Sequence, residues 1–408
     1  MVNKATKTWD IRGTDFLADP GPQLVQMRRQ GALVRVKVPL MGTMWMTTTD
    51  AASRALLKDT DSFSRDPARA GNKPMDRYLW WMPRFMSPLM QNLILKDGDE
   101  HKRLRNLVDQ AFSRAQIEAM RPRIAAMAEG LLDNLPATGS VDIISSYARQ
   151  LPLLVICDLL GIPQEHREKI TRWIAPISGP TNAWRMVTAL PGLRRILRHF
   201  RADFAEVRRS GRPGLIRELV RAEADGDRLS EDELMAMVFT LFIAGHETTV
   251  HLIGDTILGL VDHPQARAAL AQDWSRIGLT IEEAMRFFSP VMMTKMHFVT
   301  RDVTFHGTRL QRGDMITALL IGANHDPDRV EAPGDFRHDR QPNAHLGFGF
   351  GPHVCLGMQL ARAEAQIAIE TLFTRFPDLE LDCPRADLAW SKRTGIRGLQ
   401  TLPLNLRG

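Results

Sequence analysis

Alternating apolar and polar positions mark two regions of the chain. Residues 32–48, ALVRVKVPLMGTMWMTT, alternate on both sides of a turn at Met41 and Gly42. Because successive side chains of a strand point to opposite faces, this segment predicts a β-hairpin. Residues 297–321 carry short β-branched runs separated by HGT and RGD, and they predict further small hairpins.

Most of the remaining chain has helical spacing. Apolar side chains recur at helical intervals from about residue 50 to residue 285, with breaks at Pro, Gly and Asp clusters, and again from residue 355 to about residue 376. Ser230 and Glu233 form a capping box, and no strong breaker follows before Asp262, which predicts one long helix. We expect a mainly α protein with small β-sheets, in a single domain of residues 1–408.

Composition narrows the class of protein. The chain has 408 residues, of which 44% are hydrophobic, enough for a large core. Its cysteines, Cys157, Cys355 and Cys383, are too few and too widely spaced for a disulfide framework, which favours a reducing compartment. The N-terminal segment lacks the apolar core of a signal peptide, and we find no run of roughly 18 apolar residues. We therefore expect a soluble, cytoplasmic protein without a membrane anchor.

The net charge of +6 does not indicate a nucleic-acid partner. Lysine and arginine are interspersed with aspartate and glutamate, and the chain has neither zinc-finger spacing nor an aromatic RNA-binding motif. The charge favours an acidic protein partner instead.

Cys355 lies within a stretch with several glycines, LGFGFGPHVCLG at residues 346–357, just before a predicted helix. Glycines at 347, 349 and 351 allow the backbone to approach a large flat group closely, and the helix start favours a thiolate. Two other interpretations remain open at this point. One is a buried structural cysteine beside a turn, and the other is a zinc site formed by His345, His353 and Cys355, which lacks the usual paired-cysteine spacing.

The middle of the predicted long helix combines Ala244 and Gly245 with Glu247 and Thr248. Glycine costs about 1 kcal/mol relative to alanine inside a helix, and a buried carboxylate needs a partner or a role. A kink or a widened turn that opens a groove for a small ligand would explain both. A plain helix–helix contact through small residues is the alternative.

Two further pairs lie on single helix faces. Glu283 and Arg286 are three residues apart, and His101 and Arg105 are four apart. An acid–base pair such as Glu283 and Arg286 is usually a solvated surface contact that contributes a few tenths of a kcal/mol, and two cations on one helix face usually form only a solvated stripe.

Taken together, these segments resemble the cytochrome P450 family in four motifs that follow the family order along nearly the whole chain. The cysteine segment is similar to the haem-ligand signature F-G-x-G-x-H-x-C-x-G at every fixed position. The other three resemble the oxygen-activation motif [AG]-G-x-[DE]-T, the E-x-x-R motif and the bacterial pattern D-x-x-x-H-x-x-x-R, here residues 244–248, 283–286 and 97–105.

The resemblance implies the cytochrome P450 fold, a triangular helical prism with small β-sheets, around one haem b. In that fold Cys355 is the proximal iron ligand, whose thiolate favours O–O cleavage, and Phe348 shields it. Thr248 hydrogen-bonds bound dioxygen, and Glu247 helps to relay protons. Arg340 is our candidate for the arginine that joins the Glu283 and Arg286 pair. The remaining implied haem contacts are His101, Arg105, Ala244, Gly245, Gly349, His353, Gly357 and His297, the last standing where the family commonly has arginine.

The implied activity is monooxygenation of a hydrophobic organic substrate with O2 and two electrons from a separate ferredoxin and ferredoxin reductase. A peroxygenase and a haem-based gas sensor are the alternatives, and Glu247 with Thr248 argues against the peroxygenase because it needs no proton relay. By family analogy, the substrate contacts are apolar side chains: Trp80, Trp81, Met82, Phe242, Val291 and Met292.

Overall fold

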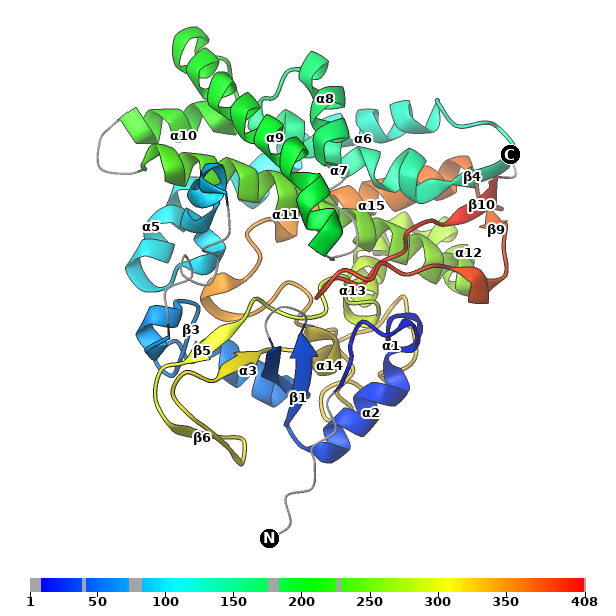
Figure 1. Ribbon diagram of the computed structural model, residues 1–408. Helices are drawn as coiled ribbons and strands as arrows, with labels where there is room; N and C mark the ends of the chain where they lie inside the picture. Colours follow the sequence, from blue (N-terminus) through cyan, green and yellow to red (C-terminus); the bar gives the residue numbers. More distant parts are fainter. Residues whose placement is uncertain (1–8, 39–41, 73–82, 175–182, 225–228, 407–408) are drawn as a thin grey trace. The chain divides into compact units, whose positions relative to one another are not determined.

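The computed structural model describes residues 9–38, 42–72, 83–174, 183–224 and 229–406 (Figure 1). The chain divides into two units. Unit 1 contains residues 1–80, 279–355 and 390–398, and unit 2 contains residues 81–278, 356–389 and 399–408. The single domain expected for residues 1–408 stays a prediction.

A five-stranded sheet organises unit 1, with the strand order β1-β2-β8-β5-β3. Strands β1 and β2 pair antiparallel with Leu33 opposite Thr47, which confirms the predicted hairpin strands. Strand β2 then pairs in parallel with β8, and β8 pairs antiparallel with β5. The strands are β1 Leu33–Val38, β2 Gly42–Thr47, β3 Phe63–Ser64, β5 His297–Val299 and β8 Met315–Thr317.

The apolar faces of this sheet and of its helices form the core of unit 1. Helix α3 (Asp50–Lys58) begins where the Thr49 side chain accepts a hydrogen bond from the Ala52 N–H, and it buries Leu56 and Leu57. These residues pack with Val299, Ile316 and other buried side chains. The other elements are α1 Thr14–Ala18, α2 Gly21–Gln30, α14 Leu320–Asn324, most of α13 Ile277–Phe287, the 3₁₀ turns η1 Pro67–Ala70 and η7 Gly351–His353, and the predicted hairpin β6 Val303–Phe305 with β7 Thr308–Leu310.

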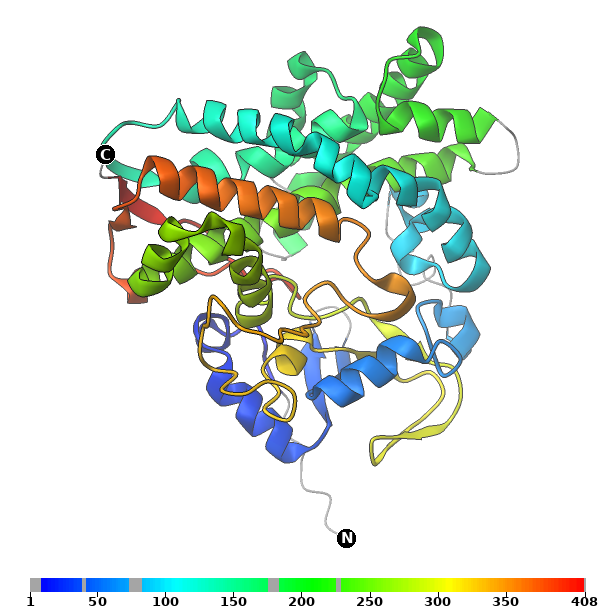
Figure 2. The ribbon, with the colours of Figure 1, turned by 180° about the vertical axis from the view of Figure 1, so that it is seen from behind.

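Unit 2 is built mainly of helices. Helix α15 runs alongside α6 in both views and also packs against α11 (Figure 2). A small sheet of order β4-β10-β9 completes the unit. Its elements are η2 Arg84–Gln91, η3 Leu93–Leu95, α5 Gly98–Asp109, η4 Gln110–Phe112, α6 Arg114–Leu132, β4 Gly139–Asp142, α7 Gln150–Leu160, α8 Gln164–Ile174, α9 Ala183–Ser210, α10 Leu215–Ala224, α11 Glu231–Asp262, α12 Pro264–Gln272, η6 Trp274–Arg276, α15 Met358–Arg375, β9 Glu380–Leu381, η8 Arg385–Asp387 and β10 Pro403–Leu406.

Helix α11 is the predicted long helix. Its capping box is complete, because the Glu233 N–H donates to Ser230 Oγ at 3.2 Å and the Ser230 N–H donates to Glu233 Oε2 at 2.8 Å. By length and composition this helix is apolar enough to cross a membrane, which corrects the expectation that no segment is. However, 67% of its apolar window is buried within the protein, as in the core helix of a folded domain.

The predicted helical region is interrupted more often than its spacing suggests. Residues 84–95 form 3₁₀ turns, and Ile144–Ala148 form one turn of π-helix directly before α7. The short strands β3, β4, β9 and β10 have between two and four residues each. Such segments are too short for a periodic signal, and pairing with distant strands decides their conformation.

Glu364 on α15 provides a test of this packing. Its side chain is fully buried, and within the described part of the chain neither carboxyl oxygen has a hydrogen-bond partner. Burial raises its pKa well above the ordinary value, so the folded protein keeps a proton that the unfolded chain releases. This group therefore lowers stability as the pH rises above the pKa in the unfolded chain, by up to about 1.4 kcal/mol per pH unit.

We expect Glu364→Gln to remove this loss. The free energy of unfolding of the variant, minus that of the unmodified protein, should increase between pH 5 and pH 8 in urea titrations. The half-buried Glu370 lies on the same helix, and Glu370→Gln is the matched control. A difference that does not change with pH would show that Glu364 is ionised in the folded state.

Candidate functional site

The loop that carries Cys355 is held by its own backbone. The Gly349 N–H donates to the Leu346 carbonyl at 2.8 Å, and the Cys355 N–H donates to the Phe348 carbonyl at 2.8 Å. Cys355 is half-buried and forms no disulfide. Gly357, two residues later, is the N-cap of α15. The cysteine is thus fixed in a tight loop directly before a helix, and it is not packed in a core.

Glycine is required at two positions of this loop. Gly349 and Gly351 have φ angles of 75° and 71°, in the left-handed region that other residues rarely adopt. A Cβ atom on Gly351 would also lie 2.3 Å from the Leu57 carbonyl oxygen on α3. Gly351, one of the glycines expected to permit close approach, therefore also allows this loop to pack against α3 within unit 1.

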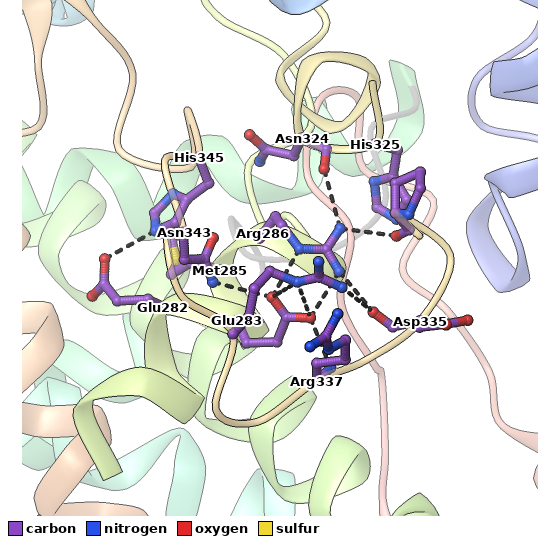
Figure 3. Close-up of polar contacts among 12 residues, drawn as sticks. Glu282, Glu283, Met285, Arg286, Asn324, His325, Asp335, Arg337, Asn343 and His345 are labelled. Atoms are coloured by element: carbon purple, nitrogen blue, oxygen red, sulfur yellow. Dashed lines mark hydrogen bonds and ion pairs between the residues drawn. The ribbon is translucent and has the colours of Figure 1, made fainter. Parts of the chain in front are cut away.

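Polar contacts anchor the start of the loop. The Leu346 N–H donates to Asn324 Oδ1 at 2.6 Å, and the Asn324 side chain donates to Ser289 Oγ at 2.9 Å. His345 Nδ1 accepts from the Gly347 N–H at 3.0 Å, while Nε2 lies 3.0 Å from a Glu282 oxygen (Figure 3). Both ring nitrogens of His345 are therefore engaged, which removes it from the zinc site considered above.

Glu283, Arg286 and Arg340 form one buried ion cluster in unit 1, of which Figure 3 labels Glu283 and Arg286. Arg286 donates from Nε and Nη2 to the two carboxylate oxygens of Glu283 at 2.8 Å each. Arg340 Nε lies 3.1 Å from both of these oxygens. Glu283 and Arg286 are 0% exposed, so the pair is not a solvated surface contact. Because this bidentate pair is buried, removing one partner would leave an uncompensated charge in the core, a cost that an exposed ion pair does not carry.

The same cluster fixes the segment that leads to Cys355. The guanidinium groups donate to the carbonyls of Asn324, Glu331, Ala332, Pro333 and Asp335. Glu283 also accepts from the Arg337 N–H at 2.8 Å and from Asn343 Nδ2 at 3.0 Å. Residues 331–343 have little regular structure, so these bonds replace the ladder that a helix or strand would supply. The sequence analysis missed Asn324 and Asn343, because a single asparagine carries no spacing signal.

The predicted oxygen-activation motif lies in the middle of α11, in unit 2. Ala244 is exposed and Thr248 is half-buried on a helix that is otherwise mostly buried. Thr248 Oγ1 donates to the Ala244 carbonyl at 2.8 Å, and Glu247 is 8% exposed. A Cβ on Gly245 would lie 3.1 Å from Ile156 Cδ1, so glycine also allows α7 to pack closely. The helix remains α-helical throughout, without the widened turn considered above.

The cationic pair of unit 2 lies on α5. His101 is buried, and Arg105 Nε lies 3.3 Å from Asp109 Oδ1. Arg103 forms an ion pair with Glu233. In unit 1, His297 is buried on β5, while Phe348 and His353 are half-buried.

The expected substrate contacts that the structure describes differ in burial. Phe242 is fully buried, with its ring centroid 5.9 Å from that of Phe200, and Met292 is fully buried in unit 1. The role of both residues as substrate contacts stays a prediction. Val291 is half-buried and pairs with Ile396 through an isolated bridge, so its role stays a prediction. Trp80, Trp81 and Met82 lie outside the described residues.

Comparison with known proteins decides the family. The family model "Cytochrome P450" matches residues 180–278 and 277–388. The chain is 36% identical over 405 residues to the polyketide biosynthesis cytochrome P450 PksS of Bacillus subtilis (strain 168), covering 97% of each protein. The chain belongs to the cytochrome P450 family.

Two further cytochromes P450 are similar along nearly their whole length. The vitamin D(3) 25-hydroxylase of Pseudonocardia autotrophica is 35% identical over 408 residues, covering 100% of this chain and 98% of that enzyme. The crystal structure of the myxobacterial cytochrome P450 CYP267B1 in complex with myristic acid superposes with a TM-score of 0.90 at 34% identity, covering 98% and 99% of the two chains.

Family membership establishes several of the sequence predictions. The protein has the mainly helical cytochrome P450 fold and is a haem-thiolate monooxygenase that uses O2, a hydrophobic organic substrate and redox partners. None of the comparisons favours the peroxygenase or the gas sensor.

Neutralising Glu283 tests the buried cluster. Glu283→Gln leaves two buried guanidinium groups without their counter-ion, so we expect the free energy of unfolding to fall by about 3–5 kcal/mol. Urea titrations of the purified variant measure this change, and haem content is the second readout.

The neighbouring Glu282 supplies the control. The Glu282 side chain, which contacts His345, is 24% exposed. Glu282→Gln should therefore lower the free energy of unfolding by less than about 1 kcal/mol. An equal decrease in the free energy of unfolding of the two variants would show that the buried cluster stabilises the protein no more than the contact between Glu282 and His345 does.

Proposed function

We propose that the haem is haem b and that Cys355 is its axial ligand. Three observations support this assignment: Cys355 is half-buried and forms no disulfide, its loop contains two glycines with positive φ, and a helix cap follows directly. Within the described ranges, no group of three His, Cys, Asp or Glu side chains is arranged to bind a metal ion. A single sulfur donor fits an iron whose other ligands come from a porphyrin.

The cationic side chains supply the second part of the proposal. His101 and Arg105 are four residues apart on α5 and share one helix face, where they bind the carboxylates of the haem. His353 and His297 do the same in unit 1. A histidine can hold a carboxylate by hydrogen bonding, and it adds charge only when protonated.

The proposed proton path uses Glu247 and Thr248. When bound, the haem supplies the site at which O2 is reduced and one oxygen atom is transferred to the substrate. The Thr248 hydroxyl now donates to the Ala244 carbonyl, and its oxygen can accept a proton while its hydrogen is donated onward. Glu247, one residue earlier, replenishes that proton from its buried carboxyl.

For the substrate we propose an extended hydrophobic molecule of polyketide, sterol-like or fatty-acyl type. The relatives support this class, since their names and titles mention polyketide biosynthesis, vitamin D(3) and myristic acid. We further propose a ferredoxin and its reductase as electron donors, with the enzyme soluble in the cytoplasm.

Replacing the cysteine tests the proposed ligand. Cys355→Ala should abolish the thiolate-type Soret band of the reduced carbonyl complex, because no other sulfur takes its place. Cys383 is likewise half-buried and outside any disulfide, so Cys383→Ala is the matched control and should keep the band. A thiolate-type spectrum in Cys355→Ala would contradict the assignment.

Replacing the threonine tests the proton path. Thr248→Ala should lower the yield of product per O2 consumed by at least about tenfold, since positioned proton transfer contributes about 10²–10⁴-fold. Product, O2 and NADH are measured with surrogate ferredoxin and reductase. Thr249→Ala removes the neighbouring hydroxyl, which donates to the Gly245 carbonyl at 3.3 Å, and should remain coupled. Full coupling in Thr248→Ala would remove this residue from the path.

A further inference from the structure

The first half of helix α9 is basic, and no acidic side chain of its own balances it. Residues 171–202 contain neither aspartate nor glutamate. Over about two turns of α9 lie four exposed arginines, Arg194, Arg195, Arg198 and Arg201. With the residues that the structure describes, none of the four forms a hydrogen bond or an ion pair.

The arginines that follow along the chain have acidic partners. Arg209 forms an ion pair with Glu206 on the same helix, and Arg212 Nη2 lies 2.7 Å from Asp203 Oδ1. Like charges three or four residues apart on a helix repel each other, and the first half of α9 places several cations at that spacing. An anionic ligand would remove this repulsion, which nothing described in the first half of α9 offsets.

An open groove of about 440 Å³ lies beside these arginines. Among its lining residues are Phe85 of η2 and, on α9, Val187, Leu190, Pro191, Arg194 and Arg198. Val187 is 58% exposed, more than any other large apolar side chain that the structure describes. The groove therefore combines an apolar end near Val187 with a basic end near Arg198.

The same α9 residues form one continuous helix face. Residues 187, 191, 194, 198 and 201 follow one another at spacings of four and three, so their side chains lie on one side of α9. At a rise of 1.5 Å per residue, the three arginines of this face span about 10 Å, or two turns of a helix.

The surroundings of this face favour a protein ligand over a lipid surface. A different face of α9 is buried within unit 2 through Leu193, Ile196, Leu197, Phe200 and Phe204. These side chains cannot enter a bilayer, as the apolar face of a membrane-surface helix does. A concave groove instead accepts a protruding side chain, and arginine pairs with carboxylates through two parallel hydrogen bonds.

We propose that this face of α9, formed by Val187, Pro191, Arg194, Arg198 and Arg201, binds an acidic helix of a partner protein. Carboxylates one turn apart on the partner helix pair with the three arginines. One apolar side chain, two turns away on the same helix, enters the groove beside Val187.

This face lies away from the helix that follows Cys355. Helix α11 packs against both α9 and α15, and α9 lies in front of it in Figure 1, whereas α15 lies in front in Figure 2. The N-cap of α15 is Gly357, two residues beyond the cysteine. The acidic partner is therefore distinct from the proposed electron donor, and the inference does not depend on the proposed haem ligand.

The first experiment measures binding of a synthetic acidic helix to the holoenzyme. A stapled, fluorescein-labelled peptide carries glutamates one turn apart on one face and a leucine two turns away, and fluorescence anisotropy gives its affinity. The combined variant Arg194→Gln, Arg198→Gln and Arg201→Gln should bind it about tenfold more weakly, the order expected for three exposed ion pairs. Val187→Ser should weaken binding of this peptide but not of one with serine in place of leucine.

Two controls separate specific pairing from general charge. Arg209→Gln removes an exposed arginine of the same helix that already has an acidic partner, and it should bind the peptide normally. Replacing the three arginines by glutamate should abolish binding of the glutamate peptide and create binding of a peptide with lysines at the same positions. Because the arginines are exposed, urea titrations should show no loss of stability in the glutamine variant.

Three results would overturn the inference. The first is equal affinity for the glutamate peptide and a glutamine peptide, or equal affinity of the combined variant and the unmodified protein. The second is a loss, in the combined variant, of binding to phosphatidylglycerol vesicles without any loss of peptide binding, which would assign the arginines to a membrane surface. The third is slower haem reduction by a surrogate ferredoxin in the combined variant, which would make this face the docking site of the electron donor.

Discussion

The structure depends on one buried carboxylate. Glu283 accepts hydrogen bonds from Arg286, Arg340, Asn343 and the Arg337 backbone, and the two guanidinium groups in turn bind carbonyls of residues 324–335. A dry carboxylate with two cations is stable only when nearly every donor has an acceptor. The cluster therefore permits only a narrow range of conformations for the irregular segment before Cys355.

The Cys355 loop uses a second constraint, which is steric. Gly349 and Gly351 have backbone angles that a side chain would strain, and Gly351 leaves no space for a Cβ beside Leu57. The loop is consequently packed against α3 at one end and tied through Asn324 to the ion cluster at the other. Helix α11 in unit 2 differs from this loop. Ala244 is exposed on a helix that is otherwise mostly buried.

The sequence predicted features that repeat locally or match a specific motif. Helix α11, the β1–β2 strands and the pairing of Glu283 with Arg286 could all be read from spacing and caps. The motif resemblance supplied the fold and the family, which composition and periodicity alone did not. The burial of Phe242 and Met292 was not predictable, because apolar residues look alike in a core and in a pocket. The pairing of β5 with β8 also joins strands that are distant in the sequence, which no local pattern records.

The central claim is that this rigid loop presents the Cys355 sulfur to a haem iron. X-ray absorption at the iron K-edge of the purified, oxidised holoenzyme tests it most directly, because the method reports the elements bound to iron without reference to activity. The account predicts porphyrin nitrogens and one sulfur in the first coordination shell. A shell of nitrogen and oxygen alone would contradict it.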